Sequence, residues 1–463
     1  MKKVSVFFAV CLLFGCGRQE IISTPTPERA AGQGDVLQLA CEPIPVVRIG
    51  FVGLGMRGKS AVRRMMSIDS VEIKAVCDLE QHNLDEVQDI LVGGNLPKAA
   101  EYTGENGWRE LCGRDDLDLV YVCTDWLSHT PIAVYAMQHG KHVATEVPAA
   151  TTVDECWQLV EAAEKNRRHC MMLENCCYDR FELATLNMAQ QGLFGEIVHV
   201  EGAYIHDLRS LSANDRLSEG SAVGDKPRIT GYWNNWRLKY NAAHTGNPYP
   251  THGLGPVCQI LDIHRGDRMD YLVSVSSGQF GITEYMRERF GEGSPQAGQD
   301  YALGDMNVTM IRTHRGKTIM VQHNVTSPRP YSRIHMVSGT KGFAQKWPVR
   351  QMAFEPNGHE TLSQPAMDSL LAAYDHRFYK IAGEQAGRLG AIAHGGMDYI
   401  MDYRLIYCLR RGLPLDEDVY DAAEWSSLVE LTEISAVNHG APVEIPDFTR
   451  GAWNKLKGFK FAE

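Results

Sequence analysis

One stretch decides the fold: Val46-Val47-Arg48-Ile49-Gly50-Phe51-Val52-Gly53-Leu54-Gly55-Met56-Arg57-Gly58. Its first seven residues are rich in β-formers and lead directly into the three glycines of a GxGxxG motif. A helical segment follows, and then a second β-rich run, 71–77, ends in Asp78, 20 residues after Gly58. This order of strand, glycine turn, helix, strand and acid is typical of a dinucleotide-binding βαβ unit.

Each glycine of the motif has a physical role in such a unit. Gly53 permits the tight turn, Gly55 lets the backbone approach a pyrophosphate, and Gly58 allows close packing of helix and strand. The N-terminus of the helix offers free N–H groups to the phosphates. Asp78 would bind both ribose hydroxyls and repel a 2′-phosphate, which favours NAD over NADP, although Arg57 is a cation that would suit the latter. The alternative is a glycine turn that binds nothing.

The pattern continues to residue 175. Further buried strands are predicted over 117–123, 142–145 and 170–175, and helices over 131–140 and 151–165. Residues 124–129 follow a strand directly, at the edge of the sheet where ligands bind in such folds. We therefore predict a Rossmann NAD-binding domain over residues 46–175.

The composition of the 463 residues excludes several classes of protein. With 44% apolar and 22% charged residues the chain is ordinary globular material rather than disordered, collagenous or coiled-coil. Its net charge of −11 gives no electrostatic reason to bind nucleic acid. The twelve cysteines show no CxxC spacing, and Cys77 and Cys123 lie in predicted buried strands, so we expect few or no disulfides and no metal site.

The N-terminus is typical of an exported protein. Lys2 and Lys3 precede a short apolar run that ends Gly15-Cys16, which predicts a signal peptide over residues 1–15. This end resembles a bacterial lipobox, which implies a lipoprotein anchored to a membrane through Cys16, at the periplasmic or outer-membrane face; an ordinary signal peptide is the alternative. Residues 16–45 are rich in Pro, Thr, Gly and Gln and are predicted to form a flexible tether.

The segment 176–463 is predicted to form a second, substrate-binding α/β domain. Strands are predicted over 197–204 and 272–277, hairpins over 308–325 and 333–347, and mostly helices over 366–437. Residues Ser210–Ile229 are polar and irregular, as in a loop or lid.

Two neighbouring segments of this domain are unusually aromatic. They read Tyr232-Trp233-Asn234-Asn235-Trp236-Arg237 and Asn247-Pro248-Tyr249-Pro250-Thr251-His252-Gly253. Aromatic faces beside Asn and Arg suit a sugar, whose C–H faces stack on rings while its hydroxyls take polar partners. The equal alternative is a structural loop whose tryptophans fill a domain interface.

The first domain resembles the Gfo/Idh/MocA oxidoreductases, which implies a Rossmann domain followed by an α/β domain with an open, mainly antiparallel sheet. Dehydrogenases of that family carry Glu-Lys-Pro where this chain has Glu146-Val147-Pro148. Valine has no proton to exchange, so the ordinary dehydrogenase mechanism is in doubt.

Nearly the whole chain after residue 45 resembles one subgroup, glycoside hydrolase family 109, the NAD-dependent α-N-acetylgalactosaminidases. The matching pieces are the glycine motif, Trp126 with His129, Glu146-Val147-Pro148, Asn175, Tyr204, the two aromatic segments and Tyr331. The resemblance implies oxidation, elimination, water addition and reduction of the sugar with no net redox change, in place of the two carboxylates of most glycosidases.

The resemblance also assigns residues to roles. His252 and Tyr249 are the predicted proton-transfer pair. Tyr249 would need its pKa lowered by a nearby cation, and Arg237 is expected either to supply that cation or to hold a sugar oxygen. Substrate contacts are predicted for Tyr204, Arg237, Tyr249, Pro250, Thr251, His252 and Tyr331. Cofactor contacts are predicted for Gly53, Gly55, Met56, Arg57, Gly58, Asp78, Trp126, Leu127, Ser128, His129, Glu146, Val147 and Asn175.

Two other functions compete with this interpretation. One is an NAD-dependent sugar dehydrogenase, and the other is a non-catalytic sugar-binding lipoprotein that keeps NAD as a structural ligand. The predicted partner in each case is a glycan or small sugar. Edge strands of an open sheet can also pair between subunits, so a second copy of the chain, in a homo-oligomer, is a further candidate partner.

Overall fold

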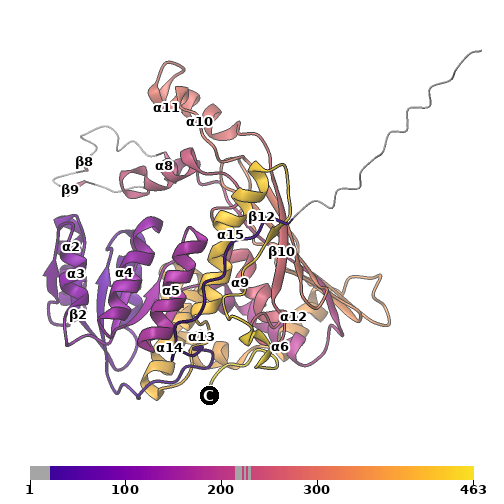
Figure 1. The fold of residues 1–463 in the computed structure, drawn as a ribbon, viewed down its shortest axis with the longest axis horizontal. Helices are drawn as coiled ribbons and strands as arrows, with labels where there is room; N and C mark the ends of the chain where they lie inside the picture. Colours follow the sequence, from indigo (N-terminus) through magenta and orange to yellow (C-terminus); the bar gives the residue numbers. More distant parts are fainter. Residues whose placement is uncertain (1–20, 214–221, 224–225, 228–230) are drawn as a thin grey trace, which may run out of the picture.

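The computed structural model describes residues 21–213, 222–223, 226–227 and 231–463 as two sheets that pack around shared helices (Figure 1). The first sheet has six parallel strands in the order β3-β2-β1-β4-β5-β6. Its strands are β1 Val47–Val52, β2 Val71–Cys77, β3 Ala100–Tyr102, β4 Leu119–Val122, β5 His142–Thr145 and β6 Cys170–Met172. Its helices are α1 Met56–Met65, α2 Gln81–Gly93, α3 Gly107–Cys112, α4 Trp126–Gln138 and α5 Val153–Asn166. The predicted Rossmann topology is confirmed.

The second sheet has eight strands in the order β15-β14-β13-β7-β12-β11-β10-β16, and only the β7–β12 pair is parallel. Its strands are β7 Ile197–Ile205, β10 Met269–Ser276, β11 Asn307–Thr313, β12 Thr318–Asn324, β13 Met336–Gly339, β14 Gly342–Gln345, β15 Gln351–Phe354 and β16 Val443–Glu444. The mainly antiparallel sheet and both predicted hairpins are confirmed.

The remaining helices follow the first sheet in the chain. They are η1 Asn175–Tyr178, α6 Arg180–Gln190, α7 Arg209–Ser212, η3 Trp233–Asn235, α8 Trp236–Ala243, α9 Thr251–Ile260, α10 Gly281–Phe290, α11 Pro295–Gly298, α12 Gln364–Ala373, α13 Arg377–Leu389, η4 Gly390–Gly396, α14 Met397–Arg411, α15 Val419–Val437 and η5 Ala452–Asn454. No helix in the described part of the chain is both long and apolar enough to cross a membrane.

The predicted loop at 210–229 is described only in part. It begins within α7, and two short strands, β8 Ala222–Val223 and β9 Lys226–Pro227, pair with each other. Residues 214–221, 224–225 and 228–230 lie outside the described residues.

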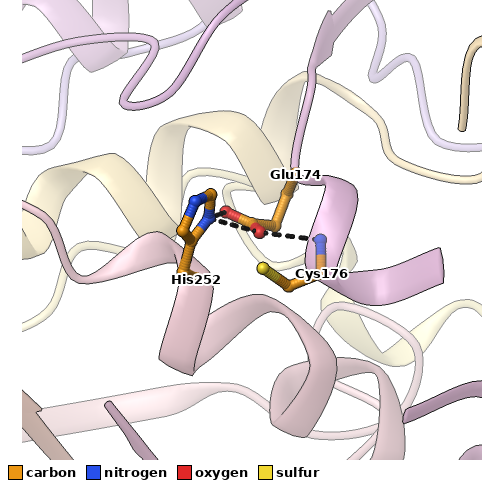
Figure 2. Close-up of side chains that lie close together, drawn as sticks. All are labelled: Glu174, Cys176 and His252. Atoms are coloured by element: carbon orange, nitrogen blue, oxygen red, sulfur yellow. Dashed lines mark hydrogen bonds and ion pairs between the residues drawn. The ribbon is translucent and has the colours of Figure 1, made fainter. Parts of the chain in front are cut away.

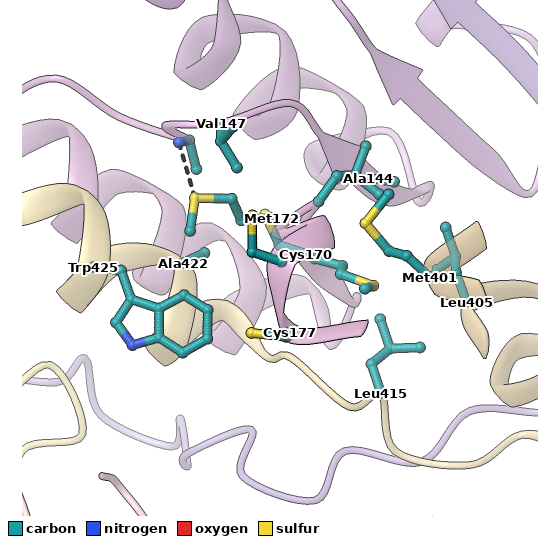
Figure 3. Packing of buried hydrophobic residues seen from close by; sticks show 14 of the residues in the cluster. Ala144, Val147, Cys170, Met172, Cys177, Met401, Leu405, Leu415, Ala422 and Trp425 are labelled. Carbon is teal, nitrogen blue, oxygen red and sulfur yellow. Dashed lines mark hydrogen bonds between the residues drawn. The ribbon is translucent and has the colours of Figure 1, made fainter. Parts of the chain in front are cut away.

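A large apolar core runs through both domains. Met172 at the end of β6 and Cys177 on η1 lie near Trp425 of α15, and Met401 of α14 belongs to the same buried cluster (Figure 3). The predicted strand residues Cys77 and Cys123 are also buried, and each of the ten described cysteines is a free thiol. Because the core is continuous, α14 and α15 hold the two sheets in a fixed relation.

The predicted flexible tether is wrong for residues 21–45, which lie along the folded domains. Ile22 pairs with Val443 of the β16 edge, and Arg29 forms a salt bridge of 2.9 Å with buried Glu164 of α5. Val36 and Leu39 are buried in the core. A few apolar side chains and backbone hydrogen bonds therefore order a segment whose composition is typical of a linker. We call residues 21–45 the strap.

Candidate functional site

Two adjoining cavities lie at the carboxyl ends of the parallel strands. The first, of about 440 Å³, lies over the glycine motif between α1 and Asp78, and we call it the glycine-loop cavity. The second, of about 740 Å³, extends toward the second sheet and is rich in tyrosine and tryptophan; we call it the aromatic cavity. Met56, Arg57, Tyr232 and Trp236 line both cavities, so the two adjoin.

The backbone of the glycine motif is shaped by close approaches. Gly53 has φ +88°, and a Cβ on it would lie 2.6 Å from the carbonyl carbon of Cys123. A Cβ on Gly58 would lie 2.0 Å from the Gly53 oxygen. A Cβ on Gly55 would meet nothing within 4 Å, so the space above this residue is open. Gly53 and Gly58 are required by the fold, whereas Gly55 leaves room for a ligand.

Asp78 lies at the end of β2, beside the glycine turn. Its carboxylate accepts hydrogen bonds from the backbone N–H of Leu54 at 2.6 Å and of Glu80 at 2.9 Å, and from the amide of Asn83 at 3.0 Å. These bonds fix the carboxylate on the wall of the glycine-loop cavity. The N-terminus of α1, the open space at Gly55 and the anchored Asp78 together fit a dinucleotide, with pyrophosphate at the helix and ribose at the acid.

The structure places most predicted site residues on one of the two cavities. The glycine-loop cavity is lined by Gly53, Gly55, Met56, Arg57, Asp78, Leu127 and Ser128. The aromatic cavity is lined by Met56, Arg57, Trp126, His129, Glu146, Val147, Asn175, Tyr204, Arg237, Tyr249, His252 and Tyr331. The roles of these residues stay predictions.

Three predicted residues line neither cavity. Gly58 is buried against Gly53, which suits the packing role expected of it. Pro250 and Thr251 were predicted to contact substrate, but both are buried where α9 begins. Their contact with substrate stays a prediction, since the helical turn directs Tyr249 and His252, rather than the residues between them, toward the cavity.

A buried carboxylate holds the predicted proton-transfer residue His252. Figure 2 shows Glu174, which follows β6, directed at the imidazole ring, with Nδ1 2.7 and 3.0 Å from the two carboxylate oxygens. On the other side, His252 Nε2 lies 3.4 Å from the hydroxyl of Tyr249. Burial opposes ionisation of Glu174, but the charge and hydrogen bond of His252 outweigh it and hold the pKa of the carboxyl below its usual value.

Three tyrosines of the aromatic cavity, Tyr204, Tyr249 and Tyr331, remain protonated at neutral pH. Burial raises the pKa of Tyr249 well above its usual value, although the guanidinium of Arg237 lowers it. The pKa values of Tyr204 and Tyr331 are raised for the same reason. The lowered pKa that proton transfer by Tyr249 would need is therefore not found, and its hydroxyl acts as a hydrogen-bond donor or acceptor.

Arg237 is a buried cation surrounded by rings. Its guanidinium lies 4.8 Å from the ring centres of both Trp126 and Tyr249, and Nη1 donates a hydrogen bond of 2.8 Å to the hydroxyl of Tyr232. Its Nε and Nη2 atoms are buried without a hydrogen-bond partner among the described residues. A desolvated donor on a cavity wall is a binding point for a ligand oxygen.

The segment 232–237 lines both cavities and lies at the domain interface, and its contact with a sugar stays a prediction. Tyr232 and Trp236 pack edge-on at 5.3 Å and face both cavities. Trp233 donates a hydrogen bond of 3.1 Å to Glu80 of the Rossmann domain. The aromatic segment thus closes the domain interface and forms the wall between the two cavities.

Ion pairs join α1 to the second domain beneath these cavities. Arg57 contacts Glu146 at 2.9 Å and Asp398 of α14 at 3.0 Å. Asn175 donates a short hydrogen bond to Asp398. The predicted cofactor residues Arg57, Glu146 and Asn175 therefore belong to one network, and Arg57 is neutralised by carboxylates rather than free for a 2′-phosphate.

Sequence reasoning missed several residues of the aromatic cavity, among them Arg333, Trp347 and His394. It also missed the carboxylates Glu174 and Asp398 behind the walls. The position of Glu174 at the end of a predicted strand was an available signal, because ligand-binding residues gather there. Nothing in the local sequence marks the others, which reach the site through long-range contacts.

A metal ion is disfavoured at the densest group of ligand atoms. Glu174, Cys176 and His252 offer atoms within 4.8 Å of one another. However, Arg333 lies 3.3 Å from the Cys176 sulfur, and burial raises the pKa of that thiol well above its usual value. A protonated thiol beside a guanidinium is a poor cation ligand.

Comparisons with known proteins agree with both halves of this site. Residues 178–455 match the family model of the C-terminal domain of glycosyl hydrolase 109, and residues 47–174 match that of an oxidoreductase family with an NAD-binding Rossmann fold. A Bacteroides fragilis protein named alpha-N-acetylgalactosaminidase is 59% identical over 427 residues, which cover 92% of this chain and 97% of the relative. A glycosyl hydrolase family 109 protein of Phocaeicola vulgatus is 54% identical over 91% of this chain and 99% of its own.

Among solved structures the chain is similar to dehydrogenases in fold. A levoglucosan dehydrogenase in complex with NADH and L-sorbose superposes with a TM-score of 0.62 at 18% identity, covering 87% of this chain and 100% of that one. A myo-inositol 2-dehydrogenase from Lactobacillus plantarum gives 0.58 at 13% identity, covering 87% and 100%. These likenesses show the shared two-domain fold. The family models and the close relatives place the chain itself in glycoside hydrolase family 109, as an NAD-binding glycosidase.

Proposed function

We propose that the protein hydrolyses terminal α-linked N-acetylgalactosamine from glycans, with bound NAD and no net oxidation. The observation that carries the proposal is the Glu174–His252–Tyr249 chain of contacts, in an aromatic cavity that adjoins the glycine-loop cavity. The name of the 59% identical relative supports the choice of sugar.

The residues of the aromatic cavity divide the work of binding and proton transfer. Tyr204 and Tyr331 offer ring faces and hydroxyls to the sugar, and Arg237 offers two unpaired donors to a sugar oxygen. Glu174 holds His252 so that its Nε2 faces the substrate, as a carboxylate does in other histidine-based sites. His252 then removes and returns the proton of the sugar ring, and Tyr249 binds a neighbouring oxygen.

The cofactor is the reason that no pair of flanking carboxylates is needed. Bound NAD supplies reversible oxidation of the sugar, which acidifies the adjacent ring proton and so allows the glycosidic bond to be broken by elimination. Gly55, the N-terminus of α1 and Asp78 are the groups that would hold it. Val147 lines the cavity and carries no titratable proton, which distinguishes this wall from that of a lysine-dependent dehydrogenase.

The test is a panel of 4-nitrophenyl glycosides on residues 21–463, led by the α-N-acetylgalactosaminide, with nitrophenol release and nicotinamide absorbance followed together. Release without net NADH is the expected result, and the most active sugar names the substrate class. NADH accumulation without release would indicate a sugar dehydrogenase instead. Binding without either signal would indicate a sugar-binding protein.

We also propose that the chain is exported and anchored through a lipid on Cys16. The support is the Lys2-Lys3 start, the apolar run and the small residue before the cysteine. Mass spectrometry of the membrane fraction tests the proposal, because a lipidated protein should begin at Cys16 and carry acyl chains. The Cys16→Ala variant should lose these and leave the membrane fraction. A soluble, unmodified native protein would contradict the proposal.

A further inference from the structure

One segment of the second domain crosses the carboxyl ends of the Rossmann strands. At one end of the segment Trp236 packs edge-on against Trp126, which follows β4, with 4.9 Å between the ring centres. At the other end Trp233 donates a hydrogen bond of 3.1 Å to Glu80, which follows β2. Because β1 lies between β2 and β4 in the sheet, the segment passes across the end of β1, where the glycine motif begins. We call residues 231–237 the crossing segment.

The crossing segment forms part of the wall of the glycine-loop cavity. Four of its residues line this cavity together with the residues expected to hold a dinucleotide, and they are Gly231, Tyr232, Trp233 and Trp236. A dinucleotide bound at Gly55 and Asp78 would therefore lie between the Rossmann domain and the crossing segment. The position of this segment then affects how readily such a ligand leaves.

The backbone of the crossing segment has an uncommon conformation. Asn234 and Asn235 have φ +50° and +48°, so two consecutive residues are left-handed. Residues other than glycine keep such a conformation only where their surroundings over-determine it. Here Asn235 is buried, and Asn234 accepts a hydrogen bond of 2.9 Å from Lys239 of α8. This fixed turn joins Trp233 to α8 and so determines where the indole ring lies.

Glu80 places the contact with Trp233 beside the predicted ribose-binding acid. Its backbone N–H donates a hydrogen bond of 2.9 Å to Asp78. Its side chain makes no capping hydrogen bond with α2, which begins at the next residue. One carboxylate oxygen accepts from Trp233, and the other lies 3.8 Å from Nδ1 of His82. The carboxylate of Glu80 thus joins the second domain to the edge of the cofactor site.

We propose that the hydrogen bond between Trp233 and Glu80 is a latch that slows the release of NAD; the need for such a latch rests on the proposed function. The proposed reaction oxidises the sugar and later reduces it, so the same cofactor molecule must stay bound for the whole cycle. Its loss between the two steps would leave an oxidised sugar and an inactive enzyme. A dehydrogenase with net oxidation has the opposite requirement, because it must exchange its cofactor after each turnover.

The test measures how fast NAD leaves the protein. Protein saturated with unlabelled NAD is mixed with excess radiolabelled NAD, and the label that becomes bound is followed over time. Trp233→Phe keeps an aromatic ring and removes the N–H donor, whereas Glu80→Leu removes the acceptor. Each should raise the release rate about tenfold, since a partly exposed hydrogen bond to a carboxylate is lost. Trp453→Phe, in η5 and outside both cavities, is the control and should leave the rate unchanged.

The double variant distinguishes a latch from two independent effects. Trp233 is 38% exposed and the side chain of Glu80 is 41% exposed, so neither change should unfold the protein. If the two residues act through their shared hydrogen bond, the double variant should release NAD no faster than either single variant. An unchanged rate in either single variant, or effects that multiply in the double variant, would overturn the proposal.

Glycosidase activity is followed separately, because the release rates are measured without substrate. With the proposed function, the single variants should lose activity over successive turnovers, and added NAD should restore it. If the unaltered protein cleaves no glycoside, the proposed function fails, and the release rates still decide whether the latch exists.

Discussion

The glycine-loop cavity and the aromatic cavity adjoin, but different forces shape them. The first is a backbone structure, in which Gly53 and Gly58 are required because any Cβ would collide with main-chain atoms. The second is made by side chains from both domains, and buried ion pairs fix its polar groups. Steric exclusion therefore governs the cofactor side, and charge complementarity governs the substrate side.

This difference has consequences for mutation. A single methyl group is enough to damage the first cavity, because main-chain atoms cannot move aside as a flexible side chain can. In the second, removal of one charge leaves its partner buried and unpaired without changing the shape of the wall. Folding and cofactor binding should respond to the first kind of change, and catalysis and substrate binding to the second.

The largest effect is expected for Gly58→Ala. The added Cβ would lie 2.0 Å from the Gly53 oxygen, so α1 must move away from β1. We expect loss of bound NAD, complete loss of activity and a lower melting temperature, measured by nicotinamide absorbance and calorimetry. Gly93→Ala at the end of α2 meets nothing within 4 Å and is the control. Normal cofactor content in Gly58→Ala would refute the steric account of this cavity.

The next effect is expected for Glu174→Gln, which removes a charge and keeps the shape. His252 would lose the anion that orients its ring, and we expect kcat to fall about a hundred- to a thousandfold with bound nicotinamide unchanged. Glu433→Gln, which removes the partner of the more exposed His244, is the matched control and should have little effect. Loss of cofactor in the Glu174 variant would show that the two cavities are not independent.

A third prediction concerns His142, a buried histidine of the Rossmann domain that is kept neutral rather than paired with a carboxylate. Burial, with a contribution from Arg168, lowers the pKa of His142 to about 4. In the unfolded chain His142 binds a proton more readily than in the folded protein. The contribution of its neutral ring to the free energy of unfolding is therefore complete above about pH 6.5 and is lost as the pH falls toward 4. His142→Asn keeps the acceptor for the N–H of His169.

Urea unfolding at pH 7 and pH 4.5 measures this contribution. The unaltered protein should lose about 2 to 3 kcal/mol more stability on acidification than the His142→Asn variant. Equal losses in the two proteins would mean that His142 does not contribute to acid sensitivity.

The smallest effect is expected for Arg237→Lys, which keeps the charge but not the planar fork. An ammonium cannot stack on Trp126 and Tyr249 while it also donates to a sugar oxygen. We expect KM to rise about tenfold, which is near 1.4 kcal/mol, with cofactor content unchanged. Lys239→Arg on the same helix is the control. A change in kcat alone would assign Arg237 to the reaction rather than to binding.

The fold was predictable from sequence where the pattern is local. The GxGxxG motif, the acid after β2 and the alternating strands of β11 and β12 each depend on residues a few positions apart. The strap was not predictable, because Val36 and Leu39 belong to one short apolar run in a segment of linker composition. Its order comes from partners such as Glu164, far along the chain.

The candidate site was predictable in part for the same reason. Many of its aromatic residues lie in two short segments, and the resemblance to family 109 indicated further residues such as Trp126, Asn175 and Tyr331. The carboxylate partners were missed because Glu174 and His252 are 78 residues apart, and Arg57 and Asp398 are 341 apart. No spacing in the sequence indicates such pairs, and only the folded chain shows which charges are buried together.

The docked strap also limits how far the protein could stand from a membrane. Six peptide units separate Cys16 from Ile22, which is fixed at the edge of the second sheet. Even fully extended, six residues span only about 20 Å. With the proposed lipid on Cys16, the β16 edge would stay within that distance of the bilayer surface. The protein would then act on glycans close to the membrane rather than on glycans far from it.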